Sequence, residues 1–381
     1  MPMPRAPVPH STRLRDLTGF GANPGALLGR VYVPEAMADK APLVVVLHGC
    51  TQTADGYDHG AGWSHLADEL GFAVLFPQQQ RSNNPNLCFN WFSPIDARRN
   101  SGEALSIRQM IAAMVDAHGI DESRIFITGL SAGGAMASIM LATYPEVFAG
   151  GAIIAGLPFG AAASVNDAFA RMRGEGYPSD AHLAGLIRQA SRHDGPWPSV
   201  SVWQGSGDRT VDASNAERII AQWQIVHGLA GAAPERDIVD ESRHRVWRDA
   251  GGRVAVEAYE IVGMGHGTPL HTTGAQACGA SGPFMLEAGI SSTRHIARGW
   301  GLTASARPTA AAEPSAAARA PAREHAMAYH TDLPERPTVL SSVDAVSPDG
   351  PVGFEPPEPD ARPHGIKAII ESALRKAGLM R

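Results

Sequence analysis

The amino-acid sequence predicts an α/β protein in which helices cover both faces of a mostly parallel sheet. Runs such as 42–47 and 72–77 are short and continuously apolar, which is typical of parallel strands buried on both sides. Segments with apolar residues at helical spacing, such as 102–118, alternate with these runs, as crossover helices do. Residues 15–302 are therefore expected to form one domain, after a flexible lead at 1–14.

The elements of this domain follow from apolar runs and from the residues that interrupt them. Strands are predicted at 29–34, 42–47, 72–77, 124–128, 149–155, 199–203, 243–248 and 254–262. Helices are predicted at 63–70, 102–118, 134–143, 182–191, 213–227 and 285–300. The first strand follows a proline-rich lead and is expected at the sheet edge. Gly71 ends the first helix, and Tyr144-Pro145 ends the third.

The charge of the chain and its first residues indicate which partners and which cellular location to expect. The chain has 381 residues, a net charge of −6 and a pI near 6.2, which argues against nucleic acid or an anionic membrane as the main partner. Its first residues contain prolines and lack the apolar core of a Sec signal peptide, which favours a cytoplasmic location. The uncharged run 147–166 contains glycines and a proline, so it is expected to form a buried strand and a loop rather than a membrane span.

The pentapeptide Gly-Leu-Ser-Ala-Gly at 129–133 lies between a predicted strand and a predicted helix. In this context Gly-x-Ser-x-Gly is the pattern of a nucleophile elbow, a strained turn that exposes the serine hydroxyl at the carboxyl end of a sheet. Glycines flank the serine because a Cβ there would collide with the neighbouring strand or helix. Ser131 is thus the candidate nucleophile, and the α/β-hydrolase fold is expected.

A nucleophilic serine needs a histidine to accept its proton and a carboxylate to orient that histidine. In α/β-hydrolases the acid and then the histidine follow the serine in the chain. Asp208 lies in a glycine-rich loop directly after a strand and is the preferred acid. Asp212 and Asp194 are the alternatives, because they lie less directly at a strand end.

The candidate histidine is His266, which lies in a Gly-Met-Gly-His-Gly loop beyond the last predicted strand. His271 is the alternative. His227 falls on a predicted helix and His244 at the start of a strand, so both are less suitable.

Acyl transfer also generates an oxyanion, which requires backbone N–H donors that are already in place. The expected donors are the N–H of Ala132, next to the nucleophile, and that of Cys50, in the loop after an early strand. The sequence has no His-Glu-x-x-His motif, no phosphate-binding loop and no complete dinucleotide fingerprint. No cofactor and no metal are expected.

Four separated motifs together resemble the polyhydroxybutyrate depolymerase family of serine esterases. They are 47–52 (Leu-His-Gly-Cys-Thr-Gln), 88–92 (Cys-Phe-Asn-Trp-Phe), 129–134 (Gly-Leu-Ser-Ala-Gly-Gly) and 264–269 (Met-Gly-His-Gly-Thr-Pro). These α/β-hydrolases cut short-chain polyhydroxyalkanoates and are similar to feruloyl and acetylxylan esterases. The resemblance covers roughly residues 15–302 and supports Ser131, Asp208 and His266 as the triad.

The resemblance also implies that Cys50 donates to the oxyanion and that it pairs with Cys88 in a disulfide, the alternative being two free buried thiols. Trp91, Phe89, Phe92 and Trp203 are candidate walls for an apolar acyl or polyester chain, and core packing is expected for some of them. Secreted members of the family carry a signal peptide and often a polymer-binding domain after a linker.

In this chain, residues 303–365 are rich in alanine and proline and are expected to be a disordered linker. The final segment, 366–381, has one apolar stripe at helical spacing and is predicted to be a short amphipathic helix. It either packs on its own domain or frays, or it contacts an apolar surface or partner.

The function expected from these residues is serine-dependent ester hydrolysis through an acyl-enzyme, on a short-chain polyhydroxyalkanoate or its oligomers. One alternative is a carbohydrate esterase that removes feruloyl or acetyl groups. An alternative from another class is a non-catalytic protein that binds polyester granules.

Overall fold

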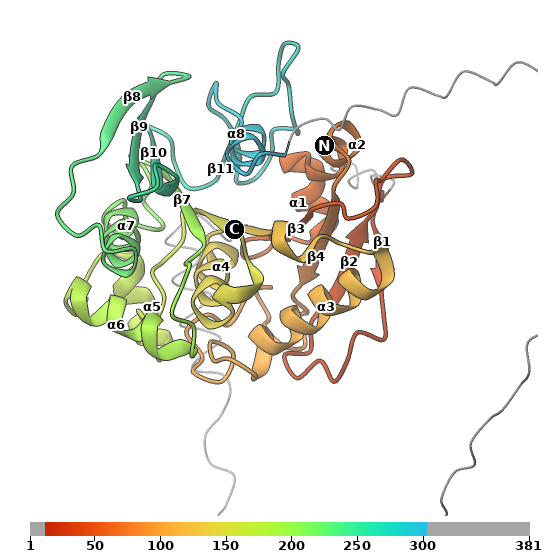
Figure 1. Ribbon diagram of the computed structural model, residues 1–381, viewed down its shortest axis with the longest axis horizontal. Coiled ribbons are helices and arrows are strands. Elements are labelled where there is room, and N and C mark those ends of the chain that lie inside the picture. Colours follow the sequence, from red (N-terminus) through yellow and green to blue (C-terminus); the bar gives the residue numbers. More distant parts are fainter. Residues whose placement is uncertain (1–11, 303–381) are drawn as a thin grey trace, which may run out of the picture. The chain divides into compact units, whose positions relative to one another are not determined.

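The computed structural model describes residues 12–302, in which a ten-stranded sheet is the central element (Figure 1). Its strands are β1 (Arg15–Leu17), β2 (Leu28–Tyr32), β3 (Leu43–Leu47), β4 (Ala73–Gln78), β5 (Ile125–Leu130), β6 (Gly150–Ile154), β7 (Ser199–Gly205), β8 (Glu235–Val239), β9 (Ser242–Arg248) and β10 (Val254–Ile261). A second, two-stranded sheet pairs β11 (Thr268–Leu270) with β12 (Met285–Glu287).

The large sheet has the order β1-β2-β4-β3-β5-β6-β7-β10-β9-β8. Its middle strands, from β4 to β10 in this order, are all parallel, whereas β1, β2, β9 and β8 add antiparallel pairs at the two edges. Parallel strands place their carboxyl ends along one edge of the sheet, where ligands bind in this fold class. The predicted mostly parallel α/β architecture is confirmed.

Helices cover both faces of the sheet. They are α1 (Ala54–Ala61), α2 (Trp63–Leu70), α3 (Gly102–His118), α4 (Ala132–Thr143), α5 (Val165–Met172), α6 (Asp180–Ala190), α7 (Ser214–Val226) and α8 (Ser292–Gly299). Buried residues of α3, α4, α6 and α7 pack on one face, and those of α1, α2 and α8 on the other. Along β3, Val45 points into the first core and Val44 and Val46 into the second, as the two-residue period of a strand requires.

Several elements differ from the sequence-based predictions, and β1, β8, β11 and α5 were not predicted at all. The segment 285–300 is not one helix, because β12 pairs with β11 across an intervening loop before α8 begins. The strand β2 is not at the edge, because the three-residue β1 pairs with it from outside. The helix α1 was not predicted, since four glycine or aspartate residues within its eight positions weaken the helical pattern.

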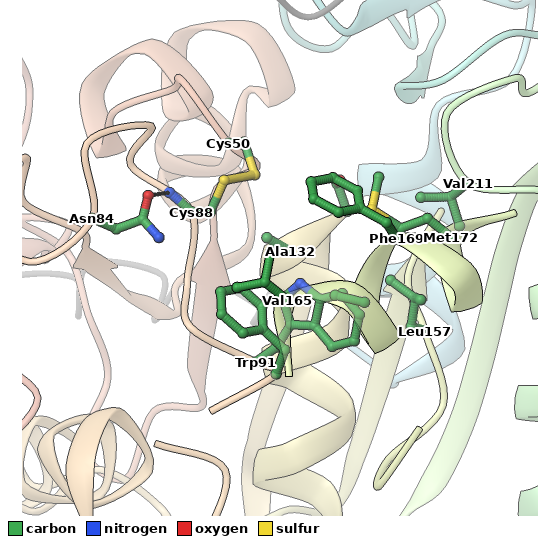
Figure 2. Close-up of a pocket in the computed structure, with 13 residues that line it drawn as sticks. Cys50, Asn84, Cys88, Trp91, Ala132, Leu157, Val165, Phe169, Met172 and Val211 are labelled. Carbon is green, nitrogen blue, oxygen red and sulfur yellow. Dashed lines mark hydrogen bonds between the residues drawn. A yellow bond between two sulfur atoms is a disulfide. The ribbon is translucent and has the colours of Figure 1, made fainter. Parts of the chain in front are cut away.

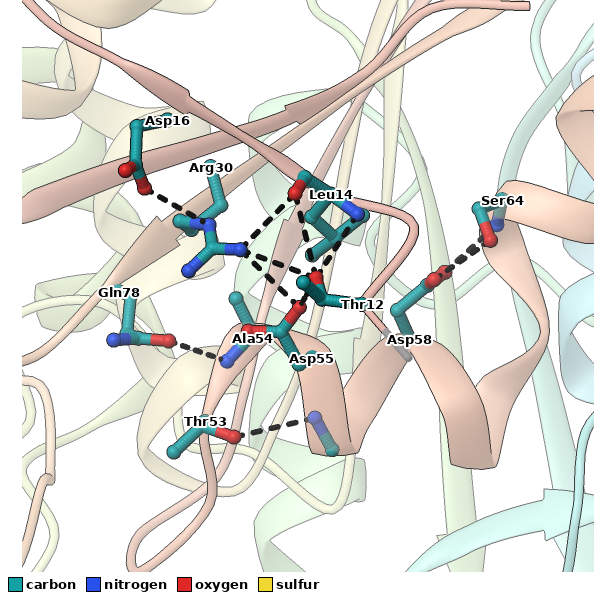
Figure 3. A network of polar contacts seen from close by, with 11 residues as sticks. Thr12, Leu14, Asp16, Arg30, Thr53, Ala54, Asp55, Asp58, Ser64 and Gln78 are labelled. Atoms are coloured by element: carbon teal, nitrogen blue, oxygen red, sulfur yellow. Dashed lines mark hydrogen bonds and ion pairs between the residues drawn. The ribbon is translucent and has the colours of Figure 1, made fainter. Parts of the chain in front are cut away.

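Polar contacts hold α1 against the sheet, directly after the loop that carries Cys50 (Figure 3). The Gln78 side chain at the end of β4 accepts a hydrogen bond from the backbone N–H of Ala54, the first residue of α1, at 2.8 Å. Arg30 on β2 forms ion pairs with Asp16 on β1 and with Asp55 on α1, each at 3.3 Å. The start of α1 is therefore held to β2 and β4, directly after the 48–53 loop.

Among residues 12–302, no helix is both long enough and apolar enough to span a membrane. The run 147–166 contains β6, a connecting segment and the start of α5, so the predicted buried strand is confirmed. The predicted linker at 303–365 and helix at 366–381 lie outside the described residues.

Candidate active site

Ser131 occupies a sharp turn between β5 and α4. Its backbone has φ 58° and ψ −118°, a conformation that L-residues rarely adopt and that strand and helix packing must impose. A Cβ at Gly129 would lie 2.3 Å from the carbonyl oxygen of Gly133, and one at Gly133 would lie 2.3 Å from that of Leu47. Both glycines are therefore required by close backbone approach, and the turn has the geometry of a nucleophile elbow.

Asp208 and His266 are hydrogen-bonded to each other beyond the ends of β7 and β10. His266 Nδ1 lies 2.7 Å from Asp208 Oδ2, and both side chains are buried. The other carboxylate oxygen, Oδ1, accepts hydrogen bonds from the backbone N–H groups of Thr210 and Val211 at 2.8 and 2.9 Å. These donors hold the carboxylate in place, and the carboxylate fixes the imidazole with Nδ1 as its hydrogen-bonded nitrogen.

The alternative acids do not share this environment. Asp212 is exposed and accepts a hydrogen bond from the N–H of Ser214, at the start of α7. Asp194 is exposed in a separate surface pocket, together with Trp197 and His227.

The two histidines that the sequence made less suitable also have other partners. His227 Nε2 lies 3.1 Å from the carbonyl oxygen of Pro198, and His244 lies between Asp237 and Glu257. His271 lies beyond β11, in a bridge with Cys278.

The loop after β3 brings Cys50 next to the elbow. Gln52 Oε1 accepts a hydrogen bond from the Gly49 N–H at 2.9 Å, which holds the turn closed. His48 is fully buried, and burial lowers its pKa to about 4, so the ring is neutral. Its Nε2 accepts from the Gln79 N–H, and Nδ1 donates to the Gly49 carbonyl oxygen at 2.8 Å. Within the described chain, no hydrogen-bond acceptor is seen for the N–H of Cys50 or of Ala132.

A disulfide joins Cys50 to Cys88, the pairing implied by the family resemblance. Cys88 belongs to a loop that is anchored by hydrogen bonds to the buried carboxyl of Glu103. This carboxyl accepts hydrogen bonds from Gln79 Nε2 and from Asn90 through its backbone N–H and Nδ2, at 2.6–2.9 Å. Burial, with a smaller contribution from Asp96, raises the pKa of Glu103 to about 8.

Ser131 and Cys50 lie at the junction of two small pockets. The disulfide-side pocket, of about 60 Å³, is shown in Figure 2 and is lined by Cys50, Asn84, Cys88, Trp91, Phe92, Ser131, Ala132, Leu157, Val165, Ala168, Phe169, Met172 and Val211. The histidine-side pocket is lined by Gly49, Cys50, Gln52, Leu130, Ser131, His266 and Phe284. The serine is thus shared by a largely apolar pocket and by a second pocket that contains the imidazole.

Two of the predicted pocket aromatics lie elsewhere, which corrects the sequence-based assignment. Trp203 is fully buried, stacks on Tyr259 with ring centroids 3.8 Å apart, and donates from Nε1 to Ser201. Phe89 is also fully buried, 5.1 Å from the His48 ring. Trp91 and Phe92 do line the disulfide-side pocket, as expected.

Helix α5 supplies a wall that was not predicted. Its residues Val165, Ala168, Phe169 and Met172 line the disulfide-side pocket. They are spaced at i, i+3, i+4 and i+7, so a helical stripe in the sequence would have identified them. Asn84 also lines this pocket and was not predicted either.

Among residues 12–302 there is no cluster of three or more histidine, cysteine, aspartate or glutamate residues that could hold a metal ion. The chemistry available at the elbow is that of a serine hydroxyl, an imidazole paired with a buried carboxylate, and backbone N–H donors.

Comparisons with known proteins agree with this chemistry. Residues 28–248 match the family described as esterase PHB depolymerase. The poly(3-hydroxyalkanoate) depolymerase C of Paucimonas lemoignei is 45% identical over 291 residues, which cover 76% of this chain and 70% of that protein. The feruloyl esterase B of Talaromyces stipitatus is 28% identical over 271 residues, 69% of this chain and 74% of the relative.

Among solved structures, an acetyl xylan esterase from Aspergillus awamori is similar with a TM-score of 0.61 and 27% identity, over 66% of this chain and 93% of that one. The order of strands and the similarity to this esterase agree on the α/β-hydrolase fold. The chain belongs to the esterase PHB depolymerase family and is a carboxylic ester hydrolase.

Proposed function

We propose that this protein is a serine esterase that works through an acyl-enzyme, with Ser131 as nucleophile, His266 as general base and Asp208 as the acid that orients it. The observation that carries the proposal is that Ser131 and His266 line one pocket while Asp208, buried behind the imidazole, binds its Nδ1. The single esterase domain corresponds to residues 15–302.

In the first half-reaction, Ser131 Oγ attacks the ester carbonyl carbon and its proton passes to His266 Nε2. The carbonyl electrons move to the oxygen, and the N–H groups of Cys50 and Ala132 stabilise the resulting oxyanion. The intermediate then collapses, the bond to the alcohol oxygen breaks, and His266 gives its proton to that oxygen. The alcohol leaves and the acyl group stays on the serine.

In the second half-reaction, water replaces the alcohol. His266 takes a proton from the water as it attacks the acyl carbon, and it returns this proton to Ser131 Oγ when the acid leaves. Asp208 stays ionised throughout and stabilises the imidazolium that forms twice in each cycle.

The proposed substrate is a short-chain polyhydroxyalkanoate or its oligomers. The relative from Paucimonas lemoignei, a poly(3-hydroxyalkanoate) depolymerase, supports this class. The disulfide-side pocket is largely apolar and small, about 60 Å³, which suits one short acyl unit better than a feruloyl ring. Acetyl esters of carbohydrates are the second candidate, because the acetyl xylan esterase from Aspergillus awamori has the same fold.

The test compares wild type with Ser131→Ala on a p-nitrophenyl ester, hydroxybutyrate trimer, polymer film, acetylated xylan and a feruloyl sugar ester. We expect cleavage of the trimer, and a loss of at least about 10³-fold in kcat for the variant. Cleavage of only the carbohydrate esters would reassign the substrate class. Hydrolysis that survives Ser131→Ala would contradict the mechanism, and binding to polyester without any hydrolysis would favour the granule-binding alternative.

A further inference from the structure

The two pockets at Ser131 have different roles in the reaction proposed above. His266 must protonate the departing alcohol oxygen, so the alcohol leaves through the histidine-side pocket, next to Gln52 and Phe284. The acyl part of the ester then occupies the disulfide-side pocket. Because this pocket holds only about 60 Å³, a bound acyl unit lies close to all of its walls.

Asn84 is unusual among these walls. Besides the Ser131 hydroxyl and the indole N–H of Trp91, it carries the polar side-chain group of a pocket otherwise lined by apolar residues and the disulfide. It is only 7% exposed. Figure 2 shows its carboxamide oxygen turned toward Cys88, with the amide nitrogen on the other side of the group.

Hydrogen bonds determine which atom of the Asn84 carboxamide is the oxygen. Oδ1 accepts from the backbone N–H groups of Asn86 and Cys88 at 3.0 and 3.3 Å, so Nδ2 is the remaining atom. Nδ2 donates one of its two N–H bonds to Asn90 Oδ1 at 2.8 Å. No described residue accepts the other N–H, and a buried unpaired donor of this kind favours a ligand that can accept it.

The partner of Asn84 is itself held in one orientation. Asn90 donates from Nδ2 to Glu103 Oε1 at 2.8 Å and from its backbone N–H to Oε2 at 2.9 Å. This leaves Asn90 Oδ1 facing Asn84. The chain from Glu103 through Asn90 therefore orients the Asn84 amide before any substrate binds.

We propose that Asn84 selects hydroxyacyl esters by donating a hydrogen bond from Nδ2 to the oxygen on carbon 3 of the acyl unit. In a hydroxyalkanoate this atom is a hydroxyl oxygen at the chain end and an ester oxygen within the chain, and both accept. An acetyl or butyryl ester has no oxygen there and leaves the buried donor unpaired, which costs binding free energy. This inference rests on the proposed function and specifies how the same site recognises its acyl group.

The test uses two esters of the same acyl chain length, p-nitrophenyl 3-hydroxybutyrate and p-nitrophenyl butyrate. The readout is the ratio of their kcat/KM values, from which any general loss of folded enzyme cancels. Asn84→Leu keeps the shape of the side chain and removes the donor. Asn86→Leu is the matched control, because Asn86 is in the same loop and is also buried but does not line the pocket.

We expect wild type and Asn86→Leu to prefer the hydroxybutyrate, and Asn84→Leu to lose about 10-fold of that preference. An unchanged ratio in Asn84→Leu, or an equal loss in Asn86→Leu, would overturn the role of Asn84. The proposed function fails by a different result, namely hydrolysis of both esters that persists in Ser131→Ala.

Discussion

Asp208 Oδ2 and His266 Nδ1 lie 2.7 Å apart, although 58 positions separate the two residues in the chain. Their loops meet because glycines let the backbones approach. A Cβ at Gly205 would lie 2.3 Å from the carbonyl oxygen of Met264, and the Gly207 N–H donates to that same oxygen at 2.9 Å. Asp208 and His266 are thus positioned by two loops that pack directly on each other.

Replacing Asp208 with asparagine should lower kcat by about 10³–10⁴-fold, because a neutral amide can neither fix the correct tautomer of His266 nor stabilise its charged form. Steady-state hydrolysis of p-nitrophenyl butyrate measures the effect. Asp212→Asn is the matched control, since this aspartate is exposed and its side chain accepts from the N–H of Ser214, at the start of α7. Equal losses in the two variants would contradict the assignment of Asp208.

Replacing Gly133 with alanine should destabilise the elbow. The new Cβ would lie 2.3 Å from the carbonyl oxygen of Leu47 and 2.5 Å from that of His48, so α4 or the loop after β3 must shift. We expect the free energy of unfolding to fall by about 1–3 kcal/mol, measured by urea denaturation, and activity to fall with it. Gly282→Ala, where no atom lies within 4 Å of the added Cβ, should leave both unchanged. A stable, fully active Gly133→Ala would refute the tight fit.

Breaking the Cys50–Cys88 disulfide should cost both stability and activity. The bridge spans 38 positions, for which loop-closure entropy predicts about 3–4 kcal/mol. The double variant Cys50→Ser/Cys88→Ser should melt at a lower temperature. It should also hydrolyse esters more slowly, because the backbone N–H of residue 50, the proposed oxyanion donor, is no longer tied to the 88–92 loop.

The third cysteine provides the control for this experiment. Cys278 is buried and unbridged. A reductant should lower the Tm of Cys278→Ala by as much as it lowers that of wild type. It should not change the Tm of the double serine variant, which has no bridge to reduce. A wild type whose Tm is indifferent to reductant would argue against the bridge.

Glu103 should make stability depend on pH in a defined direction. Burial raises its pKa from 4.5 to about 8, so between these values the folded protein keeps a proton that the unfolded chain has lost. The contribution of Glu103 to stability is therefore fully present below pH 4.5 and is lost as pH rises toward about 8.

The charged group that also raises the pKa of Glu103 is Asp96, whose Oδ1 accepts a hydrogen bond from the Glu103 backbone N–H. Glu103→Gln does not titrate, so its unfolding free energy should decline less steeply over this range than that of wild type. Chemical denaturation at a series of pH values gives both slopes, and parallel curves would exclude Glu103 as the source.

Much of the fold was predictable from local pattern. The runs 42–47 and 124–128 became the adjacent parallel strands β3 and β5, because apolar, β-branched segments of this length satisfy a strand buried on both faces. The elbow was also predictable from local pattern. Its turn is short and tightly packed, so it requires glycine at positions 129 and 133 on either side of Ser131. Pattern failed at 285–300, where strand pairing across a loop overrides local helix propensity.

By itself, the sequence determined the order of chemical groups along the chain, a serine in a glycine turn, then an aspartate and a histidine in loops after strands. Only the tertiary structure decided which side chains surround the serine. Trp91 lines the pocket while Phe89 and Trp203 are in the core, and Asn84 joins the wall although no motif marks it. The physical reason is that a residue's type sets its chemistry, whereas the direction of its side chain depends on packing between segments distant in sequence.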